Sequence, residues 1–195
     1  MNKIKPNLVL IGGGGHCVSV IDIIENENEF NITGILDSNI IENNILGYKI
    51  IGGDDLIPKL VKENTFFLIT VGQIKSYSSR KKINKTLIEN NAKIATVISP
   101  LAYVSKHANI EEGTVIMNHA VVNAKSKIGK NCIINTMSNI EHNVSVGDFC
   151  HISTCAVVNG DSVIGNGTFI GSNATISNNV TINENSIISA GKFIK

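Results

Sequence analysis

From residue 98 onward, the chain carries a branched apolar residue at every sixth position. All seventeen positions from Ile98 to Ile194, taken in steps of six, hold Ile or Val. A small residue, usually Ala, Ser, Thr or Cys, stands two positions before most of them. A period of six predicts one short strand and one turn per hexad, and three hexads close a triangular coil of 18 residues. The pattern therefore predicts an all-β left-handed parallel β-helix over residues 96–195, with about five stacked coils.

The residue just before each Ile or Val should point outward, and residues 18 apart should stack into three columns. One column is mostly polar: Asn109, Lys127, Ser145, Val163, Thr181. A second is mixed: Tyr103, Val121, Asn139, Val157, Thr175, Phe193. The third is apolar apart from one histidine: Val115, Ile133, His151, Phe169, Ile187. An exposed apolar stripe usually marks an interface, and a prism face repeated around a threefold axis closes a trimer. We expect a homotrimer; scattered surface apolar residues are the alternative interpretation.

The first 95 residues show a different pattern, in which short apolar runs alternate with helical periodicity. Strands are predicted at 8–11, 32–36 and 66–71, with a short edge strand at 48–51; helices are predicted from the glycine loop to about residue 28, at 54–63 and at 76–91; residues 94–98 lead into the prism. Alternating strands and helices predict a parallel α/β sheet, whose ligands lie at the carboxyl ends of the strands. We interpret residues 1–95 as a Rossmann-like domain.

Four consecutive glycines, Gly12–Gly15, lie between the first strand and the first helix. The Gly12-x-Gly14 spacing matches the start of a dinucleotide fingerprint, but Cys17 occupies the third glycine position. Backbone N–H groups at a helix N-terminus bind phosphate, and Asp37 at the end of the second strand suits a sugar hydroxyl. Since only about four parallel strands precede the prism, a nucleotide sugar fits this domain better than a dinucleotide. A glycine-rich turn without a ligand is the alternative.

Composition narrows the classes of function. A formal net charge of +1 without a basic stripe argues against a nucleic-acid partner. No run of 18 apolar residues is present, so we expect no membrane span, and the apolar run Leu8–Ile11 is too short for a secretory signal. We therefore expect a cytoplasmic protein. The four cysteines lack metal-ligand spacing and are interpreted as reduced, with Cys132 and Cys150 stacked as core residues.

Five histidines are candidates for chemistry. His142 falls at a corner position of its hexad, where it is exposed, and an imidazole is the natural general base near neutral pH. His151 falls in the middle of the apolar face, nine residues or one and a half faces away, so the two should meet only across a subunit boundary. His107 and His119 are expected at the solvated surface. A metal site would need a third convergent imidazole, which the spacing does not supply, so no metal is expected.

Several short motifs together give a specific resemblance. They are Gly14–Gly15–His16 after the first strand, Leu36–Asp37 after the second, Val71–Gly72, Arg80–Lys81–Lys82–Ile83, and the run Asn135-Thr136-x-Ser138-x-Ile140-Glu141-His142 continuing to Val146-Gly147-Asp148-Phe149-x-His151. On these residues the chain resembles the sugar O- and N-acyltransferases of the sialic-acid O-acetyltransferase type, especially the bacterial UDP-4-amino-sugar N-acetyltransferases. The resemblance covers nearly the whole chain.

The resemblance implies roles for individual residues. His142 matches the catalytic base, flanked by Glu141 and Asn143. The residues that match nucleotide-sugar contacts are Gly14, Gly15, His16, Asp37, Ser38 and Gly72. The residues that match acetyl-CoA contacts between adjacent prisms are His151, Ser172 and Ala190. Relatives usually carry an acidic residue where this chain has Asn143, and Glu141 is a candidate to compensate. Relatives also continue beyond the position of Lys195 into a tail. The resemblance therefore does not indicate which residues hold the adenine end of the cofactor.

The resemblance and the exposed histidine together predict direct acyl transfer. His142 would take a proton from the acceptor while the acceptor attacks the thioester of acetyl-CoA, and no cysteine in the matched motif calls for an acyl-enzyme. We expect the amino group of a nucleotide-linked amino sugar as acceptor. O-acetylation of a sugar such as sialic acid is one alternative, and a non-catalytic trimeric scaffold that binds sugar nucleotides is another.

Overall fold

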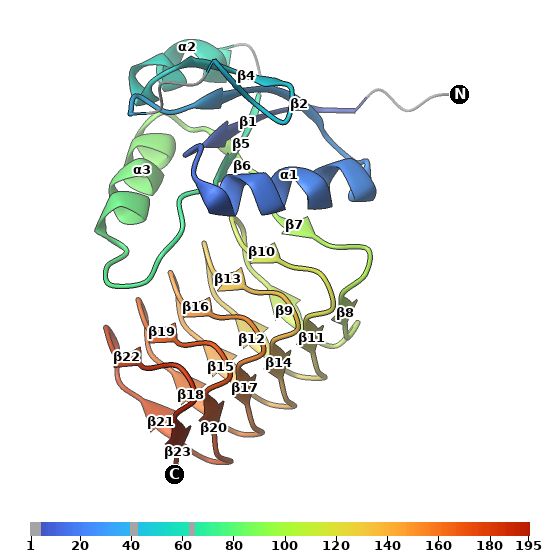
Figure 1. Ribbon diagram of the computed structural model, residues 1–195, viewed down its shortest axis with the longest axis vertical. Coiled ribbons are helices and arrows are strands. Elements are labelled where there is room, and N and C mark those ends of the chain that lie inside the picture. The colour runs from blue at the N-terminus through green and yellow to red at the C-terminus, as the bar shows by residue number, and fades with distance from the viewer. Residues whose placement is uncertain (1–4, 40–42, 63–64) are drawn as a thin grey trace. The chain divides into compact units, whose positions relative to one another are not determined.

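The computed structural model describes residues 5–39, 43–62 and 65–195, and the chain divides into two units (Figure 1). The first unit takes its residues from Met1–Gly72 and Ser78–Ala95, and the second from Gln73–Tyr77 and Thr96–Lys195. A short piece of chain within the first sequence half, Gln73–Tyr77, thus packs with the second unit. Across the described ranges, no helix is both long and apolar enough to cross a membrane.

The first unit is a mainly parallel sheet with helices, as predicted. Its strands are β1 (Asn7–Ile11), β2 (Asn31–Leu36), β3 (Asn44–Ile45), β4 (Tyr48–Gly52), β5 (Phe66–Ile69) and β6 (Lys93–Ile94), in the order β3-β4-β2-β1-β5-β6. Its helical segments are α1 (Gly15–Glu27), the 3₁₀ turn η1 (Asp54–Leu56), α2 (Ile57–Lys62) and α3 (Ser78–Glu89). The described strands other than β3 pair in parallel, and β3 runs antiparallel to β4.

The sequence predicts most of these elements, but some pairings and bounds differ. The segment expected as an edge strand, β4, pairs on one side with β2 and on the other with β3, because a tight turn at Leu46–Gly47 folds the chain back. The described residues form five parallel strands, rather than about four, since the short β6 adds to β5. The helix predicted at 76–91 is shorter, since Ser76 and Tyr77 pack with the second unit. The helix predicted at 54–63 forms as η1 and α2, and residue 63 lies outside the described residues. α1 forms as expected because its apolar residues recur at helical spacing and Asn28, at φ 61°, closes it with an N–H bond to the Ile24 carbonyl.

The second unit is the predicted β-helix, built from seventeen two-residue strands within the fully described range 96–195. One face holds β7 (Val97–Ile98), β10 (Val115–Ile116), β13 (Ile133–Ile134), β16 (His151–Ile152), β19 (Phe169–Ile170) and β22 (Ile187–Ile188). The next holds β8 (Tyr103–Val104), β11 (Val121–Val122), β14 (Asn139–Ile140), β17 (Val157–Val158), β20 (Thr175–Ile176) and β23 (Phe193–Ile194). The third holds β9 (Asn109–Ile110), β12 (Lys127–Ile128), β15 (Ser145–Val146), β18 (Val163–Ile164) and β21 (Thr181–Ile182). Figure 1 shows these strands stacked in successive coils.

The corners of the prism account for part of the chain's Asn and Gly residues. Every sixth residue from Gly113 to Gly191 has a positive φ between 53° and 77°. This left-handed conformation is easy for Gly and tolerated by Asn and Asp, which are common at these positions. The Ile and Val of the hexads point inward and form one continuous core, which also contains Cys132 and Cys150 as predicted.

The apolar column does not form the exposed stripe that the sequence predicts. Val115 and Ile133 are 0% exposed and His151 is 8% exposed in the single chain. Phe169 is half-buried, and only Ile187, at 54%, is widely exposed. The prediction was wrong here because the hexad pattern reveals which side chains point outward but not which part of the same chain covers them.

Candidate active site

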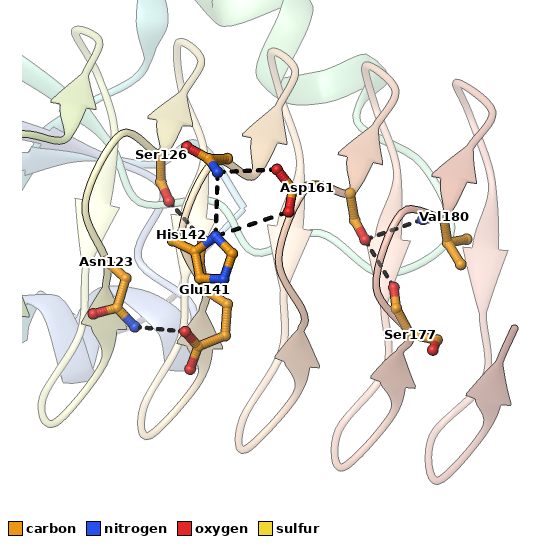
Figure 2. Close-up of polar contacts among 9 residues, drawn as sticks. Asn123, Ser126, Glu141, His142, Asp161, Ser177 and Val180 are labelled. Atoms are coloured by element: carbon orange, nitrogen blue, oxygen red, sulfur yellow. Dashed lines mark hydrogen bonds and ion pairs between the residues drawn. The ribbon is translucent and has the colours of Figure 1, made fainter.

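His142 occupies an exposed corner of the β-helix, in the turn between β14 and β15. Its side chain is 56% exposed. The Nδ1 atom lies 3.2 Å from Asn143 Nδ2 and 3.9 Å from Asp161 Oδ2. Figure 2 shows Nδ1 facing Asp161, with the second ring nitrogen directed away from it. The site therefore pairs an exposed imidazole with a carboxylate, and Nε2 lies on the side of the ring away from that carboxylate.

The absence of a side chain at Gly160 leaves the space that the His142 ring occupies. A Cβ atom built on Gly160 would stand 2.6 Å from His142 Cε1 and 2.8 Å from Nε2, distances that real Cβ atoms do not adopt. The ring therefore lies directly against the Gly160 backbone, in the coil that follows its own. Any other residue at position 160 would push the imidazole out of this place.

The carboxylate of Glu141 is turned away from His142. It accepts a hydrogen bond from Asn123 Nδ2 at 3.0 Å, and the Glu141 backbone carbonyl accepts one from the Ser126 hydroxyl (Figure 2). Asn139 Nδ2 donates a further bond to the carboxylate at 2.9 Å. The carboxylate beside the imidazole belongs instead to Asp161, which the sequence reasoning missed. The available signal was the spacing: Asp161 follows Asn143 by 18 residues, so the two stack on one corner.

In the first unit, the glycine loop is fixed by the ends of three strands. Gly12 has φ 103°, and a Cβ there would lie 2.5 Å from Val71 Cγ2. Gly13 N–H donates to Asp37 Oδ2 at 2.8 Å, and the Thr70 hydroxyl donates to the Gly12 carbonyl at 2.6 Å. The other Asp37 oxygen accepts from Asn39 N–H at 2.8 Å. Asp37 thus holds the loop in shape, a role that the sequence did not indicate, and Thr70 was missed.

The N-terminus of α1 opens at the end of this loop. Gly14 is the N-cap residue and provides no side-chain cap, and a Cβ on either Gly14 or Gly15 would meet nothing within 4 Å. Gly72 lies beside His16, since a Cβ on Gly72 would be 3.7 Å from His16 Cβ. Cys17, in the first turn, is fully buried, and burial raises the pKa of its thiol to about 11. The loop therefore presents backbone, not a reactive thiol, to a ligand.

A cavity of about 400 Å³ lies next to the loop, within the first unit. The residues lining it are Ile11, Gly12, Leu36, Asp37, Ser38, Asn39, Asp54, Val71, Ser79, Lys82 and Ile83. Partial desolvation raises the pKa of Asp54, the nearby Asp37 carboxylate raises it further, and Lys82 opposes both. The cavity lies where β1, β2 and β5 end, the expected ligand position of a parallel sheet. Asp37 and Ser38, two of the residues predicted to contact a nucleotide sugar, line it, and so do Asp54 and Lys82, which the sequence did not single out as ligand contacts.

His151 is enclosed by the segment Gln73–Tyr77. Its Nδ1 lies 2.5 Å from the Gln73 carbonyl oxygen and its Nε2 lies 3.0 Å from Asn135 Nδ2, while Phe169 packs edge-on against the ring at 5.1 Å. The Gln73 side chain donates from Nε2 to the Phe149 carbonyl at 2.7 Å, and the Tyr77 ring stacks on Phe149 at 5.6 Å. The Gln73–Tyr77 segment, called the strap below, thus covers the middle of this face.

Ser172 and Ala190 lie on another corner, between the face of β16 and the face of β17. Ser172 Oγ lies 3.0 Å from Ser153 Oγ, and Ala190 is exposed one coil further on. His142 lies on the corner between β14 and β15, so a single chain does not bring it together with these two residues.

A second cavity, of about 550 Å³, lies beside the His142 corner. The residues lining it are His107, Asn109, Lys125, Ser126, Lys127, Asn143, Val144 and Ser145. His107 and His119 are both exposed, as predicted. In the described part of the chain, no three His, Cys, Asp or Glu side chains converge in a way that could hold a metal ion.

Comparison with known proteins matches both units. Residues 7–87 match the family described as the PglD N-terminal domain, and residues 161–195 match the family described as bacterial transferase hexapeptide (six repeats). The curated UDP-N-acetylbacillosamine N-acetyltransferase of Bacillus subtilis (strain 168) is 32% identical over 121 residues, which are 57% of this chain and 51% of that protein. The match therefore spans about half the length of this curated relative.

Solved structures resemble almost the entire chain. A histidine-to-asparagine variant of perosamine N-acetyltransferase from Caulobacter crescentus, in complex with CoA and GDP-perosamine, superposes with a TM-score of 0.91 at 27% identity, over 97% of this chain and 88% of that one. The acetyltransferase domain of PglB from Neisseria gonorrhoeae FA1090, in complex with acetyl coenzyme A, gives 0.90 at 27% identity, over 97% and 93%. These matches confirm the resemblance and the fold that the sequence predicts, a Rossmann-like first unit followed by a left-handed β-helix.

Proposed function

We propose that this protein is an acetyl-CoA-dependent acetyltransferase that acts on the amino group of a nucleotide-linked amino sugar, with a UDP-4-amino sugar as the first acceptor to try. One observation carries the proposal: the exposed His142 imidazole is seated on Gly160 and faced by a carboxylate, on the corner of a transferase-type β-helix. Two of the similar proteins named above are the UDP-N-acetylbacillosamine and perosamine N-acetyltransferases, and the third is the acetyltransferase domain of PglB. The perosamine N-acetyltransferase structure holds CoA, and the PglB structure holds acetyl-CoA.

The acceptor's nucleotide is assigned to the first unit. Gly14, Gly15 and His16 present backbone N–H groups at the start of α1, a thirteen-residue helix whose dipole favours a diphosphate. Asp37 and Ser38 line the adjoining cavity, and Gly72 keeps the space beside His16 clear. The combination of anion-binding backbone and a polar cavity suits a nucleoside diphosphate joined to a sugar.

His142 performs the proton transfer. Its Nε2 takes a proton from the acceptor nitrogen as that nitrogen forms a bond to the thioester carbonyl carbon of acetyl-CoA. The tetrahedral intermediate then expels CoA as a thiolate, which gains the proton as CoA thiol, and the amide product is left. Glu141 braces the corner through Asn123 and Asn139, and Asn143 contacts Nδ1. General-base catalysis of this kind contributes about 10²–10⁴ in rate.

The cofactor site is proposed to form between chains of a homotrimer. His151, Ser172 and Ala190 are the proposed acetyl-CoA contacts, and within one chain they lie away from His142, so a neighbouring chain would bring them to it. Ser172 and Ala190 offer accessible surface, whereas His151 would contribute the small part of its side chain that stays exposed. Exposed apolar side chains remain for subunit contacts, among them Ile187 at 54% and Phe193 at 58%.

We assign the reaction to the cytoplasm and to the biosynthesis of cell-surface glycans. All four cysteines are free thiols, although Cys132 and Cys150 stack in adjacent coils of the prism, which is consistent with a reducing compartment.

The test is a screen of UDP- and GDP-linked amino sugars with acetyl-CoA, following release of CoA thiol and the acetylated product by mass spectrometry. His142→Ala is expected to lower kcat by about 10²–10⁴ while the melting temperature and the mass of the assembly stay unchanged. His119→Ala, at another exposed corner, is the matched control. Acetyl transfer only to hydroxyl-bearing sugars would identify the protein as an O-acetyltransferase. Binding of sugar nucleotides without thiol release from any acceptor would favour a scaffold.

A further inference from the structure

Asp161 lies one coil beyond His142, on the same corner of the prism (Figure 2). We propose that Asp161 is the positioning residue that orients the His142 imidazole and stabilises its protonated form, because the residue directly after His142 is Asn143 and carries no charge. The inference rests on the proposed role of His142 as general base and adds the residue that makes this imidazole competent.

A general base that acts at Nε2 requires a hydrogen-bond acceptor facing Nδ1. A histidine that takes a proton at Nε2 must carry its resting proton on Nδ1, and that N–H needs an acceptor to hold the tautomer and the ring orientation. Asn143 Nδ2 lies 3.2 Å from Nδ1 and can donate only to an unprotonated Nδ1, so it supports the other tautomer and not the one that acts as a base at Nε2. The same Nδ2 donates to Asp161 Oδ1 at 2.9 Å, which keeps the amide in this orientation. The acceptor facing Nδ1 is therefore Asp161 Oδ2, at 3.9 Å.

The backbone fixes this arrangement. The Asp161 N–H donates to the His142 carbonyl at 3.1 Å, so the two turns are locked in register. Asp161 has φ 61°, a conformation that Asp adopts more readily than most residues, and the neighbouring Gly160 carries the ring. A distance of 3.9 Å is longer than a hydrogen bond, and it is expected to shorten once proton transfer makes the ring cationic.

The charges around the corner make this carboxylate important. Lys125, Lys127 and His107 line the cavity next to Asn143, and positive charge there opposes the formation of an imidazolium. The Glu141 carboxylate, on the other side, is held by Asn123 and Asn139. Asp161 Oδ2 lies 3.9 Å from Nδ1, so removal of this carboxylate takes away the negative charge that faces the imidazolium formed during proton transfer.

The first experiment is Asp161→Asn. Asn occupies the equivalent left-handed corner positions at Asn143 and Asn179, so the variant should fold. We expect kcat to fall about tenfold, with the KM for acetyl-CoA changed less than about twofold. Glu184→Gln, which removes an exposed corner carboxylate away from His142, is the matched control and should leave both quantities unchanged.

The second experiment exchanges the two side chains. In the double variant Asn143→Asp with Asp161→Asn, a carboxylate again faces Nδ1, from position 143, and we expect most of the lost kcat to return. A purely structural role for Asp161 predicts no such rescue.

A third readout needs no substrate. Proton–nitrogen NMR of the neutral His142 ring should show less of the tautomer protonated at Nδ1 in Asp161→Asn than in the wild-type protein. An unchanged tautomer ratio together with wild-type kcat overturns the assignment of Asp161. A changed ratio in a protein that acetylates no acceptor would instead overturn the proposed function and keep the pairing of the two residues.

Discussion

The Nδ1 atom of His151 lies 2.5 Å from the carbonyl oxygen of Gln73, a residue 78 positions earlier in the chain. This contact ties the strap Gln73–Tyr77 to the prism face that the hexads leave apolar, and Asn135 holds the other ring nitrogen. The histidine therefore serves as a polar anchor inside an apolar face. A buried imidazole with both nitrogens engaged is costly to lose, because its removal leaves the Gln73 carbonyl and the Asn135 amide without this partner.

The strap can be tested through the glycine beneath Tyr77. In Gly167→Ala, the new Cβ would collide with the Tyr77 ring, whose Cδ1 atom would be 2.8 Å away. We expect the Tyr77–Phe149 stack to open and the amides of residues 73–77 to exchange faster by hydrogen-exchange mass spectrometry. Gly191→Ala is the matched control, since Gly191 has nearly the same φ, 67° against 69°, and a Cβ there meets nothing within 4 Å. Equal exchange in the two variants would mean that Tyr77 does not hold the strap.

Substitutions of two glycines in the first unit should affect different properties, the stability of the unit for Gly12 and acceptor binding for Gly14. Gly12→Ala combines a φ of 103° with a contact of 2.5 Å to Val71 Cγ2, so we expect it to lower the free energy of unfolding by about 1–3 kcal/mol. Gly14→Val has an ordinary φ of −74° and open space, and should cost less than about 1 kcal/mol as an N-cap change. If the loop binds the nucleotide, Gly14→Val should still raise the acceptor KM strongly and leave the KM for acetyl-CoA unchanged. Denaturant unfolding and steady-state kinetics separate the two effects, and a Gly14→Val enzyme with wild-type acceptor KM would contradict the assignment.

The sequence predicts the features that depend on the six-residue repeat along the chain. The hexads fix the β-helix, its inward residues and the corner position of His142, because each depends on spacing along one chain. The pairing of His142 with Asp161 arises between coils and becomes visible only when residues 18 apart are compared on the corners as well as on the faces. The strap has no periodicity, since Gln73–Tyr77 forms neither helix nor strand, and so the covering of His151 could not be read from the pattern.

The left-handed backbone of the prism corners gives a rule for stability: a side chain other than Asn or Asp should destabilise a corner that holds Asn. Asn179→Val places a β-branched side chain at φ 59°, where residues other than Gly, Asn and Asp are disfavoured. The substitution should lower the free energy of unfolding by about 1–2 kcal/mol. Thr181→Val, two residues on in the extended strand β21, is the matched control and should change stability by less than about 0.5 kcal/mol. Both side chains are exposed, so burial does not separate them. The midpoint of chemical denaturation provides the measurement, and a smaller loss for Asn179→Val than for Thr181→Val would contradict the rule.

Asp54 should make the stability of the first unit depend on pH. Its pKa in the folded protein is raised above the ordinary value of 3.8, first by desolvation and then by the Asp37 carboxylate. The folded state therefore holds the Asp54 proton more tightly than the unfolded state, and stability must fall as pH rises from 3.8 through the folded pKa. Asp54→Asn removes this contribution, so its melting temperature relative to the wild type should rise across that window and stay higher at neutral pH. Asp55→Asn, the adjacent exposed carboxylate outside the set that lines the cavity, is the control and should show a smaller change. Melting curves between pH 3.5 and 7 test the sign, because an Asp54→Asn protein that is less stable than wild type at pH 7 would mean that the Asp54 charge is stabilised rather than disfavoured in the folded state.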